Sequence, residues 1–331
     1  MNKNFFKNKS LLITGGTGSF GKAFVNYLLK NKIPLKKIIV FSRDELKQYE
    51  MSINVSEKKF SNIRYFLGDI RDKDRLFFAL ENVDIVVHAA ALKQVIAAEY
   101  NPIEFIKTNI IGSQNIIECA LQTGVQNIIA LSTDKASSPI NLYGATKLCA
   151  DKLFCSANNI KGLRDTKFSV VRYGNVMGSR GSVLQNFLKQ RNNRELLVTD
   201  LRMTRFNILL DEAINMVIWA ILNARGGEIF VPKIPSFNVI DLAKAVCEKS
   251  KIKIIGAKPG EKIHEEMISS YDSRNTFDLK KYYAIVPENL VEFYKKKFNL
   301  VEENFSYNSK TNKIYLKRNE LKKIIQNFIK N

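Results

Sequence analysis

The segment Ser10–Gly21, with the sequence SLLITGGTGSFG, decides the fold of this chain. Ser10–Thr14 is an apolar run that predicts a strand, and Gly15, Gly18 and Gly21 follow it at intervals of three. Apolar residues then recur at helical spacing. Glycines here let a backbone turn approach a pyrophosphate, and the helix N-terminus offers it free N–H groups. We therefore predict a dinucleotide-binding turn, in preference to a glycine turn without a ligand.

Strands and helices alternate regularly as far as about residue 176, which is typical of a parallel sheet with helices on both faces. We predict an α/β fold, with a Rossmann-type doubly wound parallel sheet in residues 1–176 that binds the cofactor and carries the catalytic residues. A smaller C-terminal α/β domain in residues 177–331 mainly binds substrate, although some later segments return to the first domain. The predicted strands after the first are 37–41, 63–67, 83–87, 127–131 and 168–172, and the predicted helices include 108–123 and 141–157.

The composition is that of an ordinary globular protein, with 45% hydrophobic and 25% charged residues among 331. No apolar run reaches the roughly 18 residues of a membrane span, and no signal-peptide core is present, so we expect a cytoplasmic protein. The four cysteines and two histidines have no metal-ligand spacing, and we predict no metal site. The net charge of +20 is spread along the chain and forms no compact basic motif. We therefore expect the protein to bind neither nucleic acid nor a membrane surface. An anionic nucleotide is compatible with this charge.

The end of the second predicted strand, Ser42-Arg43-Asp44, bears on the choice of cofactor. An Arg at this point accommodates a ribose 2′-phosphate, whereas an acidic residue holds a 2′-hydroxyl. Arg43, with Lys47 one turn later, favours NADP over NAD. Asp44 argues for NAD unless it caps the following helix. Asp69, at the end of the third strand, is suited either to the adenine amino group or to capping the next helix, and the sequence leaves both open.

Ser132–Lys135 ends the predicted fifth strand, at the same sheet edge as the glycine turn. Tyr143 and Lys147 follow, four residues apart on one face of a helix. An ammonium near a phenol lowers the pKa of the phenol, which suits removal of a proton from an alcohol while a nicotinamide accepts hydride. Asp134 and Lys135 add an acid and a base that alcohol oxidation does not require. Their alternative interpretation is an ion pair at a strand end.

The regular alternation weakens in the second half, and two charged segments there are candidates for ligand contacts. Thr199–Phe206 is predicted as a polar loop, in which Arg202 and Arg205 suit a diphosphate or uracil unless both are simply solvated. Lys258–Lys262 is predicted as a charged turn. A helix is expected at 239–250, and the last sixty or so residues offer no site.

In nine motifs the chain resembles the extended short-chain dehydrogenase/reductases, and more narrowly the inverting UDP-N-acetylglucosamine 4,6-dehydratases that start pseudaminic acid synthesis for flagellin glycosylation. The resemblance covers about residues 8–268. Lys258 replaces an expected Arg, and Gln94–Ala98 departs from the usual run after Lys93; both departures concern fine substrate contacts and not the reaction. The motifs are Thr14–Gly21, Phe41–Gln48, His88–Lys93, Leu131–Lys135, Asn141–Lys147, Val171–Val183, Thr199–Phe206, Gly227–Pro235 and Pro259–Lys262.

The resemblance implies a lyase that uses NADP to dehydrate UDP-N-acetylglucosamine. Tyr143, assisted by Lys147, takes the proton of the 4-hydroxyl, Lys135 removes the C5 proton, and Asp134 protonates the departing 6-hydroxyl. A Lys at 135 favours C5 inversion, since retaining relatives carry Glu there. Lys135 must be neutral to act as a base, so we expect burial and a nearby cation to lower its pKa.

The resemblance also implies contact residues at matching positions. The predicted catalytic residues are Thr133, Asp134, Lys135, Tyr143 and Lys147. The predicted cofactor contacts are Gly15, Thr17, Gly18, Ser19, Phe20, Gly21, Ser42, Arg43, Asp44, Glu45, Leu46, Lys47, Asp69, Ile70, Ala89, Ala90, Lys93, Asn109, Tyr143, Lys147, Tyr173, Asn175 and Val176. The predicted substrate contacts are Ala89, Lys93, Asn175, Val183, Thr199, Arg205, Lys258 and Glu261.

The sequence is also compatible with three other functions. A UDP-sugar 4-epimerase uses the same Tyr/Lys pair but needs no acid and base at 134 and 135. A dehydratase could act on another amino sugar for capsule or lipopolysaccharide, and a cofactor-binding sensor would need no catalytic pair. Helices 108–123 and 141–157 are of the kind that pair between subunits in this superfamily, so we expect a homo-oligomer, a dimer or a hexamer.

Overall fold

The computed structural model describes residues 2–179, 181–192 and 195–330. Its centre is a ten-stranded sheet in the order β16-β14-β15-β10-β6-β5-β4-β1-β2-β3. The seven strands from β10 to β3 are parallel, and β15, β14 and β16 extend the sheet as antiparallel strands. The order β3-β2-β1-β4-β5-β6 is the doubly wound Rossmann arrangement, so the predicted fold class is confirmed. The strands of this sheet are β1 (Ser10–Thr14), β2 (Lys37–Ser42), β3 (Ile63–Leu67), β4 (Ile85–His88), β5 (Asn127–Thr133), β6 (Lys167–Tyr173), β10 (Ile229–Pro232), β14 (Thr276–Asp278), β15 (Tyr282–Ile285) and β16 (Asn299–Leu300).

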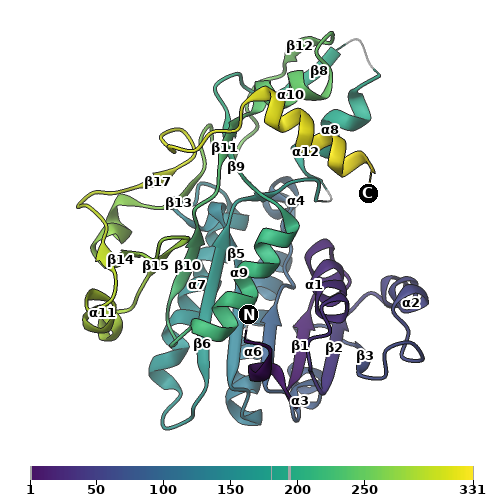
Figure 1. The fold of residues 1–331 in the computed structure, drawn as a ribbon, viewed down its shortest axis with the longest axis vertical. Helices are drawn as coiled ribbons and strands as arrows, with labels where there is room; N and C mark the ends of the chain where they lie inside the picture. Colours follow the sequence, from purple (N-terminus) through teal and green to yellow (C-terminus); the bar gives the residue numbers. More distant parts are fainter. Residues whose placement is uncertain (1, 180, 193–194, 331) are drawn as a thin grey trace.

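Helices cover both faces of this sheet, because each helix has an apolar stripe to bury. On one face α3, α6 and α7 pack against one another, and on the other α1 packs against α9. Figure 1 shows the sheet as the body of the molecule, with α9 running along it. The helices of this layer arrangement are α1 (Ser19–Lys30), α2 (Glu45–Asn54), α3 (Lys73–Leu80), α6 (Gly112–Thr123), α7 (Leu142–Ile160) and α9 (Leu210–Asn223).

The connection from β4 to α6 differs from its prediction. A single helix over 108–123 was expected, but the structure has α4 (Val95–Tyr100), α5 (Pro102–Phe105) and a π-helical segment (Ile106–Ile111) before α6. Pro102 stands at the first position of α5, where its missing N–H costs nothing. The π segment carries Asn109, whose side chain reaches the backbone of the loop after β4.

The second half of the chain builds a smaller body above the sheet in Figure 1 and has its own core. That core buries Leu184, Phe187, Leu242 and Leu321, which come from three different helices. Its elements are α8 (Val183–Gln190), α10 (Val239–Val246), α12 (Arg318–Lys330), β7 (Asn175–Val176), β8 (Glu195–Val198), β9 (Thr204–Ile208), β11 (Ser236–Asn238) and β12 (Lys251–Ile254).

Two expectations for this half are corrected. The polar loop predicted over Thr199–Phe206 becomes strand β9 from Thr204, because Thr204–Phe206 pair with β11. The helix predicted over 239–250 ends at Val246, and Cys247 is already extended. Strands β10, β14, β15 and β16 lie in the large sheet, and the division at residue 176 stays a prediction. The remaining elements are α11 (Glu288–Lys295), β13 (Glu266–Ile268), β17 (Tyr307–Asn308) and the 3-10 turns Lys3–Phe6, Asp134–Ala136 and Ser270–Asn275. None of the helices described has the length and apolar character of a bilayer span.

Candidate active site

A cavity of about 780 Å³ lies where the carboxyl ends of the parallel strands meet the smaller body. Both halves of the chain line it, as is expected of a ligand site at the switch point of a doubly wound sheet. Of the residues singled out in the sequence, those that line this cavity are Gly15, Gly18, Ser19, Phe20, Gly21, Ala89, Lys93, Thr133, Lys135, Tyr143, Lys147, Tyr173, Asn175, Val176, Val183, Thr199, Arg205, Lys258 and Glu261.

The other predicted site residues lie outside the lining of this cavity: Thr17, Ser42, Arg43, Asp44, Glu45, Leu46, Lys47, Asp69, Ile70, Ala90, Asn109 and Asp134. Most of them belong to the turn after β2, the turn after β3 or the layer directly beneath the cavity wall. Arg43 lines a smaller cavity of about 300 Å³, which Lys93 and Gln94 share with the larger one. Arg180, within the Val171–Val183 motif, lies outside the described residues.

The glycine turn has the shape that a dinucleotide requires. Gly15 has φ +63°, and a Cβ there would lie 2.9 Å from the Cα of Ala90. A Cβ on Gly21 would lie 2.5 Å from the Cα of Gly16, so helix α1 packs directly on the turn. Gly18 precedes α1 without a side-chain cap, and the first-turn residues line the cavity. The free N–H groups of this turn fit a pyrophosphate, so the residues present fit a nicotinamide dinucleotide.

The turn after β2 shows what its charged residues do. Asp44 caps α2 by accepting from the backbone N of Lys47 at 3.0 Å, and it pairs with the Lys47 ammonium. Arg43 keeps 51% of its side chain exposed, with Nη1 3.4 Å from Asp69. Asp69 pairs with Arg71 at 2.7 Å, and the cap of α3 is Asp72 instead. Asp44 therefore has a structural role, and the Arg43 side chain stays half exposed at the rim of the smaller cavity.

Tyr143 lies in the first turn of α7, which Asn141 caps by accepting from Gly144 N at 2.8 Å. Burial raises the pKa of Tyr143 to about 12, although Lys135 and the Thr133 hydroxyl act to lower it. The lowered phenol pKa expected from the sequence is therefore wrong for this structure, because burial outweighs the nearby positive charge. Lys147 Nζ donates to the backbone O of Leu131 at 2.8 Å, and burial lowers the pKa of Lys147.

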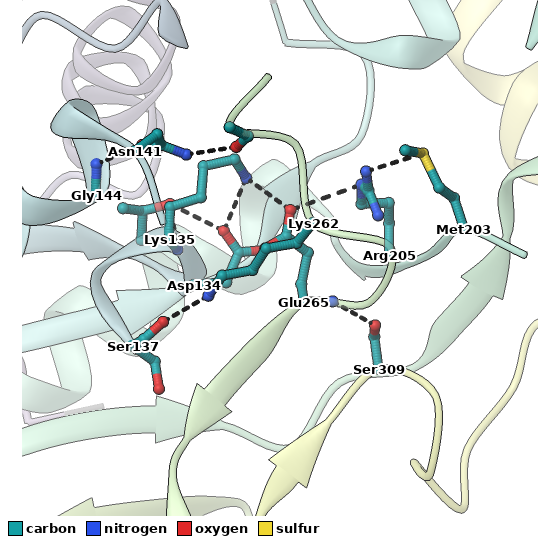
Figure 2. A network of polar contacts seen from close by, with 12 residues as sticks. Asp134, Lys135, Ser137, Asn141, Gly144, Met203, Arg205, Lys262, Glu265 and Ser309 are labelled. Atoms are coloured by element: carbon teal, nitrogen blue, oxygen red, sulfur yellow. Dashed lines mark hydrogen bonds and ion pairs between the residues drawn. The ribbon is translucent and has the colours of Figure 1, made fainter. Parts of the chain in front are cut away.

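Asp134 and Lys135 form a short turn at the end of β5, and their side chains meet (Figure 2). Lys135 Nζ lies 3.0 Å from Asp134 Oδ1 and 3.3 Å from Glu265 Oε1. Burial acts to lower the pKa of Lys135, but the two carboxylates together raise it above its usual value. The expected depression of this pKa is wrong, because the charges of Asp134 and of Glu265, which the sequence did not place beside Lys135, outweigh the effect of burial.

Arg205 lines the cavity, whereas Arg202 does not. Arg205 Nη1 donates to the backbone O of Thr204 at 2.7 Å and of Ile263 at 3.0 Å, and its Nε lies 3.7 Å from Glu265 Oε1. Arg202 pairs with Asp200 and is 73% exposed, so it is a solvated surface arginine. The two arginines of the predicted loop thus have different surroundings.

Sequence reasoning missed three groups near the site. Glu265 carries no motif of its own, although it closely follows the Pro259–Lys262 turn that the resemblance includes. For Lys262 the sequence predicts only a place in a charged turn that could reach a ligand, and the structure shows that its Nζ donates to the backbone O of Ser137 at 2.6 Å. Beneath β5, the buried pair of Asp151 and Arg172 at 3.1 Å supports Ser132 through a 2.8 Å hydrogen bond to Asp151.

Comparison with known proteins places this arrangement in a family. The sequence model of the family described as polysaccharide biosynthesis protein matches residues 11–287. The chain is 51% identical to a Campylobacter jejuni protein named UDP-N-acetylglucosamine 4,6-dehydratase (inverting), over 97% of this chain and 98% of the relative. It is 39% identical to a Rickettsia canadensis protein named UDP-glucose 4-epimerase, over 92% of this chain and 93% of the relative.

Solved structures agree on the fold. The X-ray structure of Pen from Bacillus thuringiensis matches with TM-score 0.88 and 40% identity, covering 98% of each chain. A dTDP-glucose 4,6-dehydratase from Streptomyces venezuelae, solved with NAD, matches with TM-score 0.71 and 21% identity over 87% of this chain and 97% of that chain. A neighbour of this fold thus binds a nicotinamide dinucleotide. The chain belongs to the polysaccharide biosynthesis protein family, within the extended short-chain dehydrogenase/reductases that include the nucleotide-sugar 4,6-dehydratases.

Proposed function

We propose that this chain is an NADP-dependent UDP-N-acetylglucosamine 4,6-dehydratase that inverts C5. The product is UDP-2-acetamido-2,6-dideoxy-β-L-arabino-hex-4-ulose. The observation that carries the proposal is that Lys135, paired with Asp134, lines the same cavity as Tyr143 and Lys147, since an epimerase needs only the tyrosine and the second lysine. The 51% identical relative with this activity in its name supports it further.

The residues of the site divide the reaction among them. A nicotinamide cofactor held at the glycine turn Gly15–Gly21 would accept the hydride of C4 and supply a hydride to C6, and a solvent proton would enter at C5. Tyr143 takes the proton of the 4-hydroxyl, with Lys147 adding positive charge on the same helix face. The resulting 4-ketone acidifies C5, whose proton goes to Lys135 Nζ. Asp134 gives its proton to the departing 6-hydroxyl, which leaves as water.

The 3.0 Å contact between Lys135 and Asp134 links these last two steps. Moving one proton from Lys135 Nζ to Asp134 Oδ1 converts the ion pair into a neutral amine and a neutral acid. These are the two states that the elimination requires. When the amine has taken the C5 proton and the acid has given up its own, the ion pair is restored. No external proton is needed for this half of the cycle.

The substrate contacts follow from the cavity. We propose that the UDP-sugar occupies the part lined by residues of both halves, namely Ala89, Lys93, Asn175, Val183, Thr199, Arg205, Lys258 and Glu261. Lys258 lines this region in place of the expected Arg, and a Lys offers a single point charge where an Arg would offer a planar fork. Entry of the product into pseudaminic acid synthesis for flagellin glycosylation belongs to the same proposal. The cytoplasmic location and the homo-oligomer stay predictions.

Proton NMR of UDP-N-acetylglucosamine incubated with the protein in deuterated water, without added cofactor, tests this function. We expect a C6 methyl signal of a 4-keto-6-deoxy sugar, deuterium at C5 and the L-arabino configuration. A change at C4 alone, giving UDP-N-acetylgalactosamine, would contradict dehydration and make the protein an epimerase, the activity named for the Rickettsia relative. In that case Asp134 and Lys135 are structural residues.

A further inference from the structure

Glu265 is a buried carboxylate in the cavity wall that neither the motifs nor the proposed mechanism uses. Its side chain is 2% exposed, and Glu265 lines the cavity. One oxygen, Oε1, lies 3.3 Å from Lys135 Nζ and 3.7 Å from Arg205 Nε. The other, Oε2, is buried and has no hydrogen-bond partner within the part of the chain that the structure describes. Figure 2 shows the Lys135 ammonium reaching both Asp134 and Glu265.

The C-terminal part of the chain holds Glu265 in this position. Its backbone N donates to Ser309 Oγ at 2.9 Å, and Ser309 N donates to the backbone O of Glu265 at 2.7 Å. Ser309 Oγ also contacts Thr204 Oγ1 at 2.7 Å, which ties the same point to β9. Burying a carboxylate is costly unless cations pair with it. The structure meets that requirement with Lys135 and Arg205, both of which are cavity residues.

The charges around Lys135 come from several elements. Asp134 lies on its own turn, Glu265 precedes β13, and Arg205 lies on β9. The Lys262 ammonium is fixed on Ser137 O, and burial, with a smaller contribution from the Lys135 charge, lowers the pKa of Lys262. Lys93 is close enough for the same effect, and Tyr143 lies on the α7 side. Three basic side chains therefore oppose the charge on Lys135, and two carboxylates favour it.

We propose that Glu265 is a positioning residue for Lys135. Glu265 holds the Lys135 ammonium at the cavity wall, between its own carboxylate and that of Asp134, and keeps the ammonium charged in the resting site. Without Glu265, Asp134 would be the one remaining carboxylate beside Lys135 to raise its pKa, against the lowering effects of burial and of the Arg205 charge. Lys135 would then lose its proton at a lower pH. That Lys135 acts as the C5 base rests on the proposed function, but the placement of its charge by Glu265 does not.

The charge state of Lys135 can be measured without catalysis, because only a neutral amine reacts with a small amine-selective reagent such as fluorodinitrobenzene. The labelling rate of Lys135 is followed by peptide mass spectrometry between pH 7 and 10. In Glu265→Gln we expect labelling at pH 8 to rise about tenfold or more, since an opposite charge within 4–6 Å shifts a pKa by about 1–3 units. An unchanged rate in a folded Glu265→Gln protein overturns the proposal.

The matched control is Glu266→Gln. Glu266 is the next residue, lies outside the cavity lining and accepts from Ser138 Oγ at 2.8 Å. Its loss should leave Lys135 labelling within twofold of the unchanged protein, and an equal rise in both variants would overturn the assignment to Glu265. If Glu265→Gln does not fold, Glu265→Asp carries the test, because its shorter side chain withdraws the carboxylate from Nζ. In Glu265→Asp we expect Lys135 to be labelled several times faster than in the wild type. A labelling rate equal to that of the wild type would refute the positioning role of Glu265.

A second measurement separates this inference from the proposed function. The rate of deuterium incorporation at C5 is followed against pH for both proteins, and in Glu265→Gln we expect its rising limb about one unit or more lower. A purely structural role would reduce the rate without moving the limb. Unchanged labelling alongside normal C5 exchange in the wild type would refute the positioning role alone. Altered labelling with no C5 exchange in any protein would refute the proposed function alone.

Discussion

Tyr143 illustrates how a single residue depends on its surroundings. Its phenol has a pKa of about 12 in this structure because burial removes it from water. A general base works best when its pKa lies near the working pH. In the proposed reaction, Tyr143 therefore needs further positive charge or hydrogen-bond donors as the site fills, and Lys147 lies on the same face of α7 to provide part of it.

Arg43 is the residue on which the predicted preference for NADP over NAD rests. Its guanidinium is half exposed and lies 3.4 Å from Asp69, at the rim of the smaller cavity. A hydrogen bond to a charged group contributes about 1.5–3 kcal/mol, so Arg43→Ala should raise the dissociation constant for NADP about ten- to a hundredfold and that for NAD much less. Calorimetric titration of cofactor-stripped protein measures both constants.

The control for this prediction is Arg64→Ala. Arg64 lies on the neighbouring strand β3 and contacts Glu57 and the backbone of Ser61, away from both cavities. Both constants should stay unchanged in it. An equal loss of NADP and NAD affinity in Arg43→Ala would rule out recognition of a 2′-phosphate by this residue.

Among the elements, the π-helical segment Ile106–Ile111 differs most from its prediction. Asn109 within it is 1% exposed and clamps the loop after β4: Oδ1 accepts from Leu92 N, and Nδ2 donates to Leu92 O, each at 2.9 Å. Nδ2 also donates to Thr146 Oγ1 on α7 at 3.0 Å. This segment therefore joins the loop that carries Lys93 to the helix that carries Tyr143. Such segments often occur at functional sites.

Asn109→Ala should release the loop after β4. The Leu92 amide loses its acceptor, so we expect peptides covering 89–95 to exchange amide hydrogen faster, and the free energy of unfolding to fall by about 1–3 kcal/mol. Exchange mass spectrometry measures the first effect and urea denaturation the second. Asn115→Ala on α6 is the control, because Asn115 donates to the backbone of Ile70 and Arg71 instead. Unchanged exchange over 89–95 in Asn109→Ala would show that the clamp is not needed.

At the scale of the whole molecule, the C-terminal segment links the smaller body to the cavity. Helix α12 packs on α10 and buries Leu321 completely. The Phe328 ring on α12 lies over Gly178, where an added Cβ would come within 2.1 Å of it. Ser309, upstream of α12, supports Glu265. The sequence offered no role for this region, and the structure places it behind one wall of the site.

Leu321→Ala tests whether α12 is part of this core. Removing a fully buried leucine side chain costs about 2–5 kcal/mol, so urea denaturation should show a loss of this size in the stability of the smaller body. Ile329→Ala, on the same helix but 52% exposed, should change stability by less than about 0.5 kcal/mol. Equal and small effects of both substitutions would mean that α12 contributes little to the core.

Local sequence patterns predicted the parallel strands β1 to β6, the glycine turn and the motif residues that meet at the sheet edge. These depend on local signals: apolar runs for Ser10–Thr14 and its neighbours, glycine spacing at 15, 18 and 21, and the pairing of Tyr143 with Lys147 on one helix face. Each signal lies within one element, so neighbouring residues in the sequence carry it. The strand order then places the ends of β1 and β5 at one edge.

The electrostatics of the site, in contrast, could not be predicted from the sequence. Lys135 was expected to have a lowered pKa, but Asp134 and, from a distant part of the chain, Glu265 together raise it. The same holds for Tyr143, whose pKa depends on burial by surrounding elements. Burial and long-range charge pairs leave no periodic pattern in a sequence, because they arise when separate segments pack together. The predicted catalytic residues can therefore be identified from the sequence, whereas their charge states depend on the folded structure.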